Sequence, residues 1–359
     1  MRLSPRWPLL FSLALASCGT TSSAADLGAD AGTDGGSSSG AEAGVDAGVG
    51  DAGPLPACGS GTPLALSQCV EQARYEADLE TVALERPPES AHWQAVQDLC
   101  ATRLEGLGFV VERQSYGTGV NVIGVRAGTS EPDRQVLVAA HYDHIAGCAG
   151  ADDNASGVAG ALEAARVLVG ASYPRTLVVA CWDQEELGLV GSRAYATRAR
   201  ANGDAIDAYF NFEMIGYTDS APDSQRLPVG FSLLFRAAAA EDTANRHRGD
   251  FVAVIGDPAS SPAMASLEAA ADRIGLKFIA LPLPASLLTS AATADLRRSD
   301  HAAFWEKSYP GMMITDTSEF RYDRYHCTNG PDVPANLDAR FASQVVRMTV
   351  AAAAESLGL

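Results

Sequence analysis

The chain has 359 residues, of which 47% are hydrophobic, and its formal net charge is −18 at pH 7. This apolar content is sufficient for a large core, so the sequence predicts a folded globular protein. The strong negative charge argues against a nucleic-acid partner, because neutralising phosphates requires a basic face.

Residues 1–17 have the pattern of an export signal. Arg2 and Arg6 precede the apolar run "PLLFSLALAS", which is too short to span a bilayer permanently, since about 20 residues are needed. The closing "LASC" resembles a bacterial lipoprotein box, which implies that Cys18 is lipidated and becomes the mature N-terminus. We therefore expect an exported protein, lipid-anchored at the bacterial outer membrane or cell surface. An ordinary cleaved signal with an incidental cysteine is the alternative.

Residues 18–56 are rich in Ala, Gly, Ser and Asp and contain almost no large apolar side chains. Such a segment cannot bury enough surface to offset the entropy of ordering it. We expect a flexible acidic tether there, followed by a single folded domain over residues 57–359.

The six cysteines beyond Cys18 are an even number, which makes disulfides plausible in an exported chain. Cys69 and Cys100 lie on neighbouring predicted helices and are the first expected pair. Cys148 and Cys327 each lie beside a presumed metal-site segment, so a bridge between them would brace that site. A zinc-cysteine cluster is the alternative, but no C-x-x-C spacing occurs.

From residue 62 onward, helices and short apolar strands follow one another. Strands such as "TLVVAC" are continuous apolar runs, as expected when helices cover both faces of a sheet. We therefore predict a single α/β domain with a mixed, mostly parallel central sheet flanked by helices on both faces. The expected helices are 64–83, 91–107, 155–170, 186–200, 262–274, 299–307 and 335–355, and the expected strands are 109–116, 119–126, 134–140, 176–182, 207–213, 251–255, 277–282 and 311–315.

The segment "HYDHIAGCAGADDNASG", which begins at His141, follows a predicted buried strand. In open α/β sheets, ligands bind at the carboxyl ends of strands. His141 and Asp143 are two residues apart, so their side chains share a side, and Asp143 can accept the second N–H of the imidazole. Asp153 can bridge two cations. The alternative is that Asp152, Asp153 and Asn154 only cap the helix that follows.

Three other predicted strands end in polar side chains. "CWDQEELG" places Glu185 and Glu186 together, so that one can bind a metal while the other takes a proton from water. "YFNFEMIGY" buries Glu213 in an apolar run, where an uncompensated carboxylate is costly. "YDRYHCTNGPD" supplies Tyr325 and His326 in a loop.

Taken singly, the adjacent glutamates can complement a helix dipole, and a loop histidine is usually a surface residue. The prediction of a metal site rests on the occurrence of such side chains at several strand ends together. Nitrogen and oxygen ligands of this kind suit zinc better than calcium.

Together, "HYDH…GADDNASG…DQEELG…NFEMIG…SDHAAFW…YH" resembles the co-catalytic di-zinc aminopeptidase family, which includes bacterial leucyl aminopeptidases and, more distantly, glutamate carboxypeptidase. The likeness runs from about residue 90 to the C-terminus, with the motifs in the same order. It implies a zinc exopeptidase fold, two Zn²⁺ ions per chain, and hydrolysis of N-terminal peptide bonds by water activated between the two ions.

The resemblance also implies residue roles. His141 corresponds to a ligand of one zinc ion, and Asp153 corresponds to the carboxylate that bridges both. The remaining ligand positions fall on Glu186, Glu213 and His326.

Three further residues match catalytic positions of the family. Glu185 corresponds to the general base, and Asp143 corresponds to the acid that orients the histidine ligand. Tyr325 matches a tyrosine that polarises the scissile carbonyl, with a packing role as the alternative. Asp300 and His301, in "SDHAAF", are interpreted first as structural residues.

Two other functions remain open. A glutaminyl cyclase shares the fold and part of the ligand set but typically uses one zinc ion, and a non-catalytic binding lipoprotein would have lost ligands. The complete ligand set favours the peptidase. After "YH" this chain continues with "CTNGPDVPANLD", where relatives have a Thr and a short acidic run, so the resemblance does not carry over the pocket shape. The expected partners are peptide substrates, without nucleic acid and with membrane contact only through Cys18, and the expected state is a monomer.

Overall fold

The structure is a computed structural model in which residues 54–359 are described. The predicted signal segment, most of the predicted tether, and Cys18 lie outside the described residues. Within the described part of the chain, no helix has the length and apolar character needed to cross a membrane.

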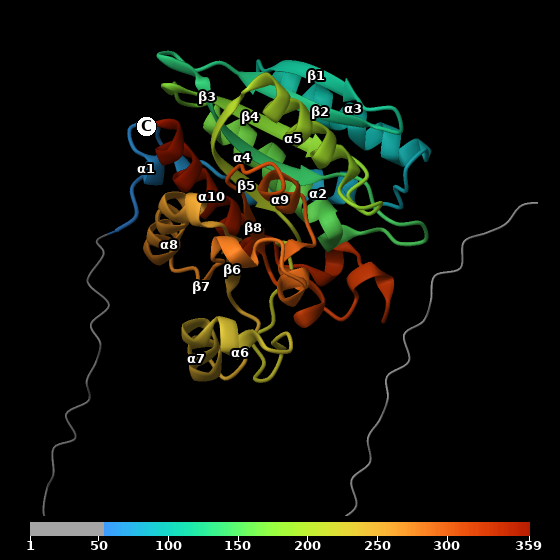
Figure 1. Ribbon diagram of the computed structural model, residues 1–359, viewed down its shortest axis with the longest axis vertical. Helices are drawn as coiled ribbons and strands as arrows, with labels where there is room; N and C mark the ends of the chain where they lie inside the picture. Colours follow the sequence, from blue (N-terminus) through green and yellow to red (C-terminus); the bar gives the residue numbers. More distant parts are fainter. Residues whose placement is uncertain (1–53) are drawn as a thin grey trace, which may run out of the picture. The chain divides into compact units, whose positions relative to one another are not determined.

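The centre of the described part is an eight-stranded sheet with the strand order β1-β2-β4-β3-β5-β8-β6-β7 (Figure 1). Strands β4, β3, β5 and β8 run parallel to one another, and β7 runs parallel to β6. The remaining pairs, β1 with β2, β2 with β4 and β6 with β8, are antiparallel. The bounds are β1 (Val110–Ser115), β2 (Val120–Arg126), β3 (Glu131–His141), β4 (Arg175–Trp182), β5 (Ala205–Phe212), β6 (Val252–Gly256), β7 (Phe278–Pro282) and β8 (Met312–Thr315).

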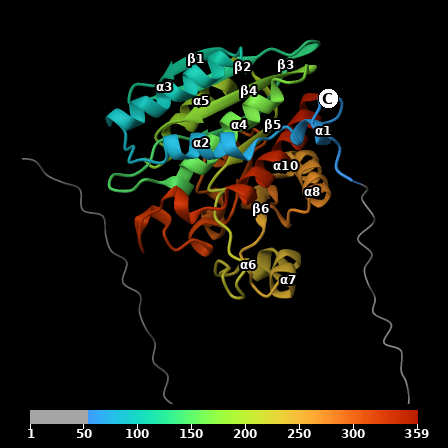
Figure 2. The ribbon, with the colours of Figure 1, turned by 180° about the vertical axis from the view of Figure 1, so that it is seen from behind.

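Helices cover both faces of the sheet, which confirms the predicted fold class. Val136, Val138 and Ala140 of β3 pack in one core with helices that lie in front of the sheet in Figure 2. Successive residues of a strand point to opposite faces. Because helices cover both faces, the β3 residues from Val136 to Ala140 are all apolar. The helices of this face are α1 (Pro63–Ser67), α2 (Gln72–Val82), α3 (Ala91–Gly106), α4 (Gly157–Leu168), α8 (Ser261–Ile274) and α10 (Ala339–Leu357).

The opposite face is divided into two smaller cores. Leu137 and Ala139 of β3 pack with α5 (Val190–Asn202) and α9 (His301–Trp305). Beside them, the strands β8, β6 and β7 pack with α6 (Phe231–Leu234) and α7 (Arg236–Ala244). The sequence analysis did not predict α6 and α7, because they are short and lie in a segment with no clear apolar period.

The four central parallel strands end at the same edge of the sheet. His141 is the last residue of β3, and Glu213 is the first residue after β5. The loop that carries Glu185 and Glu186 follows β4, and the loop that carries His326 follows β8. The sheet topology therefore directs four distant segments of the chain to one place, as expected for parallel α/β folds.

Several predicted helix bounds are corrected by the structure. The helix expected over 64–83 is two helices, α1 and α2, separated around Cys69. The helix expected from residue 186 starts only at Val190, because the N–H groups of Glu185 and Glu186 donate to Asp143 instead of entering the helix. Glu213 follows its strand instead of lying in it, although it is buried as predicted.

Three disulfides connect the cysteines of the described chain: Cys58–Cys69, Cys100–Cys181 and Cys148–Cys327. The expected Cys69–Cys100 pair is wrong, because Cys100 on α3 faces the sheet and meets Cys181 on β4. The expected bridge between Cys148 and Cys327 is confirmed, with Cα atoms 5.7 Å apart.

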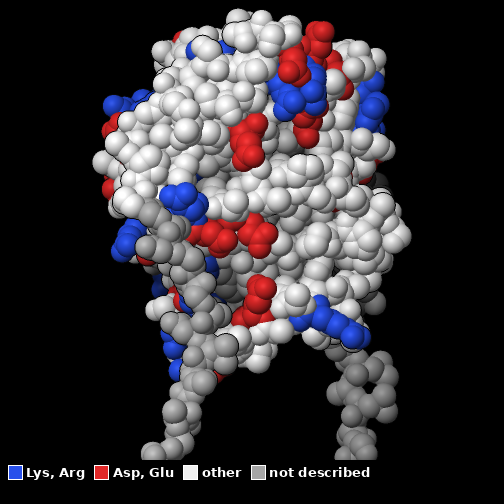
Figure 3. Space-filling model, turned by 90° about the vertical axis from the view of Figure 1, so that its left-hand side faces the viewer, with Lys and Arg blue, Asp and Glu red and all other residues white. Residues whose placement is uncertain are grey.

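Charged side chains are dispersed over the surface that Figure 3 shows. Acidic and basic groups lie in small clusters among uncharged residues, and no continuous basic patch occurs on the described residues of that face. The absence of a nucleic-acid partner stays a prediction.

Candidate metal centre

Two groups of side chains that can hold a metal ion meet at the carboxyl edge of the sheet. We name them by their members: the first metal group is His141, Asp153 and Glu213, and the second metal group is His144, Asp153, Glu186 and His326. Within each group, the ligand atoms lie within 4.8 Å of one another. All five ligands expected from the sequence are therefore brought together, and Asp153 belongs to both groups. His144 is an additional member that the sequence analysis did not assign.

The first metal group is almost completely buried. His141 Nε2 lies 3.3 Å from Asp153 Oδ1 and 3.4 Å from Glu213 Oε2. On the other side of the ring, Nδ1 lies 3.3 Å from the main-chain carbonyl oxygen of Asp143, its hydrogen-bond partner, and 3.6 Å from the carboxylate Oδ1 of the same residue. Asp143 also accepts the N–H groups of Glu185 and Glu186, at 2.9 and 3.2 Å. Asp143 thus connects the orientation of the histidine to the loop after β4.

A chain of buried hydrogen bonds holds Glu213. Ser299 donates its hydroxyl to Glu213 Oε2 at 2.6 Å, and Asn211 Nδ2 donates to Ser299 Oγ at 2.6 Å. Tyr209 donates to Asn211 Oδ1 at 2.6 Å and accepts from Trp182 Nε1 at 2.7 Å. Since Asn211 and Tyr209 lie on β5 and Trp182 lies on β4, this chain of hydrogen bonds connects Glu213 to the central sheet.

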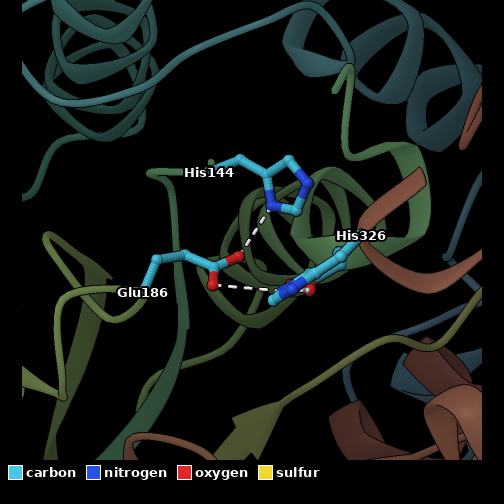
Figure 4. A group of neighbouring side chains, drawn as sticks. His144, Glu186 and His326 are labelled. Atoms are coloured by element: carbon cyan, nitrogen blue, oxygen red, sulfur yellow. Dashed lines mark ion pairs between the residues drawn. The ribbon is translucent and has the colours of Figure 1, made fainter. Parts of the chain in front are cut away.

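The second metal group comes from segments outside the sheet, and Figure 4 shows three of its members, His144, Glu186 and His326. His326 Nε2 lies 3.1 Å from Asp153 Oδ2 and 3.1 Å from Glu186 Oε2. His144 Nδ1 lies 2.8 Å from Glu186 Oε1. The His326 side chain is 28% exposed, whereas those of Asp153 and Glu186 are 3% and 8% exposed. The second metal group is therefore the more accessible one.

A bound metal ion would partner most of the buried polar atoms of the site that no hydrogen bond satisfies. Asp153 Oδ1, Glu186 Oε1, His326 Nε2 and both ring nitrogens of His144 are buried without a hydrogen-bond partner. Such atoms are costly in a folded protein unless something compensates them. Ligand atoms about 2.0–2.2 Å from a tetrahedral zinc ion lie roughly 3.3 Å apart, which is close to the separations in both groups. The residues present therefore fit zinc.

The charges of the centre favour a cation. Although burial opposes ionisation of Asp153, the His141 and His326 side chains hold its pKa well below its usual value. Burial likewise opposes protonation of His326, but the carboxylates of Asp153 and Glu186 raise its pKa to about 10. The same negative potential that draws protons onto the imidazoles attracts a divalent ion.

Glu185 and Tyr325 lie beside the metal groups. Burial raises the pKa of Glu185 well above its ordinary value, with nearby Glu213 and Asp300 adding to the effect. Tyr325 stacks on His326, with ring centroids 3.9 Å apart, and burial raises the pKa of its hydroxyl. Both residues are near the site, and the stacking shows that Tyr325 also has a packing role.

The alternative interpretation of the Asp-Asp-Asn run holds only in part. Asn154 Oδ1 accepts the N–H of Gly157 at 3.2 Å, as a capping residue does. Asp152 Oδ1 instead accepts from Gly216 at 2.8 Å. Asp153 faces the two histidines, so its carboxylate is not a helix cap.

Asp300 and His301 are buried outside both metal groups. His301 Nε2 donates to the Leu296 carbonyl at 3.0 Å, and the ring packs edge-on against Trp305. Burial lowers the pKa of His301 to about 4 and raises the pKa of Asp300 to about 7. The contacts of His301 support the structural interpretation.

Arg86 is a buried residue of the site that the sequence analysis missed. Its guanidinium donates to the main-chain carbonyls of Tyr142, Ala149, Gly150 and Asp153, at 2.5 to 3.2 Å. Burial lowers its pKa to about 10, so it stays charged at neutral pH. A lone arginine in a polar turn carries no sequence signal for this role, which is to fix the loop between His141 and Asp153.

A pocket opens beside the first metal group. Glu213 and Tyr325 line it toward the metal groups. The rest of the wall is largely apolar and comes from β6, β7, β8 and α6, with Phe231, Phe251, Ile255, Leu281 and Met313.

The strand ends of this α/β sheet thus gather two adjoining sets of histidine and carboxylate side chains that can hold metal ions. The model of peptidase family M28 matches residues 121–353. The chain therefore belongs to peptidase family M28.

Curated proteins match parts of the chain. The chain is 31% identical over 223 residues to the uncharacterized protein YfbL of Escherichia coli, covering 59% of this chain and 64% of that protein. It is 34% identical over 149 residues to leupeptin-inactivating enzyme 1 of Streptomyces exfoliatus, covering 38% and 34% respectively. The chain thus spans between about a third and two thirds of the length of these relatives.

Solved structures share the fold at low sequence identity. The Legionella pneumophila LapA aminopeptidase has a TM-score of 0.62 at 17% identity, over 82% of this chain and 72% of that one. The Porphyromonas gingivalis glutaminyl cyclase has a TM-score of 0.55 at 18% identity, over 80% and 98%. At these identities, the likeness shows the fold alone.

Proposed function

We propose that this protein is a zinc-dependent aminopeptidase that holds two metal ions. The observation that carries the proposal is the position of Asp153 between two histidines. Its Oδ1 lies 3.3 Å from His141 Nε2, and its Oδ2 lies 3.1 Å from His326 Nε2. A carboxylate whose two oxygens face two separate ligand sets is suited to bridge two ions.

Together with Asp153, His141 and Glu213 would hold one ion, and Glu186 and His326 would hold the other. Zinc bound in such sites supplies Lewis acidity, which polarises a carbonyl and lowers the pKa of water. The protein itself orients the ligands. Asp143 fixes His141 and the loop of Glu186, and the hydrogen-bond chain through Ser299 fixes Glu213.

The protein also moves the proton. Glu185, with its pKa raised by burial, takes a proton from the attacking water and delivers it to the departing amine. The Tyr325 hydroxyl keeps its proton because burial raises its pKa, so it can donate a hydrogen bond to the scissile carbonyl oxygen.

The pocket supports an aminopeptidase that prefers a large apolar N-terminal side chain. Its apolar wall suits a leucine- or phenylalanine-sized group. Its charged lining favours a cationic amino terminus over a carboxylate, because four acidic residues outnumber two basic ones. The acidic residues are Glu213, Asp242, Asp295 and Glu319, and the basic residues are Arg226 and Arg298.

The test is amino-acid release from unblocked and N-acetylated peptides, with zinc and after chelation. We expect release only from unblocked peptides, faster from Leu and Phe than from Ala or Glu p-nitroanilides, and loss of activity on chelation. Glu185→Gln should reduce kcat by about 10²- to 10⁴-fold while the bound zinc is retained. Equal cleavage of blocked and unblocked peptides would contradict the aminopeptidase assignment.

The shared fold makes a glutaminyl cyclase the second candidate. Two ligand groups built around one shared carboxylate favour the peptidase, since the cyclase typically needs a single zinc ion. Formation of pyroglutamate from N-terminal glutamine peptides without hydrolysis would reverse this ranking. Absence of bound zinc from the native protein would instead favour a non-catalytic binding role.

We further propose that the protein is exported and anchored through Cys18. Three disulfides in the described part of the chain support an oxidising compartment. Mass spectrometry of the mature N-terminus tests this, with a diacylglycerol-modified Cys18 as the expected result and an unmodified residue downstream as the contrary one.

A further inference from the structure

His144 has no role in the proposed function, yet it is one of the most enclosed polar side chains of the site. It lies three residues after His141 and is 0% exposed. Neither of its ring nitrogens has a hydrogen-bond partner. An imidazole must be desolvated to occupy such a position, and this is unfavourable unless a partner compensates it.

The ring faces the second metal group. His144 Nδ1 lies 2.8 Å from Glu186 Oε1 and shares a 4.8 Å cluster with ligand atoms of Asp153 and His326. Despite the short distance, both Nδ1 and Oε1 lack a hydrogen bond of acceptable geometry. Their close approach is that of two groups directed at a common third atom.

We propose that His144 Nδ1 is a further protein ligand of the metal ion held by Asp153, Glu186 and His326. This inference rests on the proposed metal centre but not on the proposed peptidase activity. It makes the two groups unequal, because the second metal group then offers four protein ligands and the first metal group offers three.

The surrounding chain is shaped to hold the ring in this position. Gly150 has φ 56°, and a Cβ there would lie 2.5 Å from His144 Cδ2 and 2.2 Å from the Asp153 carbonyl oxygen. The His144 backbone N–H donates to the Arg86 carbonyl at 3.2 Å. The His326 ring lies edge-on at a centroid distance of 5.5 Å. A ring fixed from three sides is already arranged for binding.

The unequal ligand numbers have a chemical consequence. Zinc sites closed by four protein ligands bind the ion tightly, whereas sites with three protein ligands keep a position open. We therefore expect the ion in the second metal group to resist chelation more strongly than the ion in the first metal group.

The experiment measures Zn²⁺ affinity by chelator competition in the full chain and in His144→Asn. Asparagine keeps a donor near the position of Nδ1 but is a poor zinc ligand, so it separates ligation from hydrogen bonding. Loss of a group that only hydrogen-bonds to a ligand weakens metal binding by about 10- to 100-fold, and we expect a larger loss for one ion only. His92→Asn is the matched control, because His92 binds the Val82 carbonyl and belongs to neither metal group.

Two measurements make the result independent of variant folding. Co²⁺-substituted protein should show a changed visible absorption in His144→Asn and an unchanged one in His92→Asn, with equal circular dichroism. X-ray absorption of the wild-type zinc protein should count three imidazoles over two ions instead of two. A zinc affinity within about 100-fold of wild type, or a count of two imidazoles, overturns the proposal.

The stoichiometry separates this inference from the proposed function. If wild type binds one ion that His144→Asn releases, His144 is a ligand and the two-ion proposal fails. If wild type binds one ion, and His141→Asn releases that ion whereas His144→Asn retains it, the His144 proposal fails. Two ions with an unaffected His144→Asn leave the proposed function intact and remove the inference.

Discussion

The two metal groups share Asp153 but are held by different means. In the first metal group, His141 ends a central strand, and Glu213 is fixed through Ser299 by hydrogen bonds that reach β5 and β4. In the second metal group, His326 lies in a long loop after β8, joined to the loop of His144 by the Cys148–Cys327 disulfide. A sheet positions the first set, and a covalent link across the surface helps to position the second.

This difference matches their exposure. The side chains of the first metal group are between 1% and 10% exposed, whereas His326 is 28% exposed. A loop that is open to solvent can admit a substrate, but it is more easily displaced. The comparison therefore predicts that perturbing one group leaves the other largely intact, except at Asp153.

The largest effect should come from the residue that both groups share. Asp153→Asn removes the carboxylate that faces both histidines, so both ions should be lost. Hydrolysis should fall by more than about 10⁴-fold, which exceeds the usual contribution of one proton-transfer group. Metal analysis with steady-state kinetics checks this. Retention of one equivalent of zinc in Asp153→Asn would contradict a shared bridging role.

The next largest effect should come from removing the Cys148–Cys327 disulfide, which lies beside the second metal group. Replacing Cys148 and Cys327 by Ser should lower the free energy of unfolding by about 2–5 kcal/mol. It should also weaken zinc binding at the second metal group. Cys58→Ser with Cys69→Ser is the control, since that bridge closes an 11-residue separation instead of 179.

Urea unfolding and chelator competition on both double variants distinguish the two effects. The control should lose some stability and keep its metal affinity. Equal metal affinity in both variants would show that the link between the loops does not position His326.

Zinc affinity at the first metal group should depend on the hydrogen bonds that hold Glu213. Ser299→Ala removes the hydroxyl that donates to Glu213, and zinc affinity at the first metal group should fall by about 10- to 100-fold. Ser266→Ala is a control, because Ser266 is half-buried on α8, donates to the Pro262 carbonyl and belongs to neither metal group. A zinc titration that resolves two affinities should show one lower affinity and one unchanged affinity in Ser299→Ala. A decrease in both affinities would contradict the prediction that the two metal groups are perturbed separately.

The same comparison explains what the sequence predicted well. Residues at the ends of parallel strands meet at one edge by topology, so His141, Glu186 and Glu213 could be placed together from apolar runs and the acids that follow them. His326 was reached through the family resemblance, since a loop histidine has no periodic signal of its own.

The site residues and the disulfide that the sequence did not predict depend on contacts between distant parts of the chain, which no local pattern encodes. His144 adjoins an assigned motif, and only its buried, unpartnered ring reveals it. Arg86 depends on carbonyls more than fifty residues away along the chain. The expected Cys69–Cys100 pair is wrong because helices that follow one another in the sequence need not place their cysteines side by side, and the partner of Cys100 is Cys181 on β4.

The last prediction concerns a buried histidine outside both metal groups. His301 has its pKa lowered to about 4 by burial, against an ordinary value of 6.5. The folded state therefore resists protonation, so the unfolded state binds the extra proton as pH falls below 6.5. Its contribution to stability is complete above pH 6.5 and is lost between pH 6.5 and 4, by about 3 kcal/mol.

His301→Gln removes this titration while keeping a donor for the Leu296 carbonyl. The free energy of unfolding of wild type, measured in urea without metal, should fall more steeply between pH 7 and 4 than that of His301→Gln. His141 gives the contrasting case, because carboxylates surround it and raise its pKa despite equal burial. Parallel pH profiles for wild type and His301→Gln would show that burial alone does not keep this ring neutral, and that the difference between the histidines has another cause.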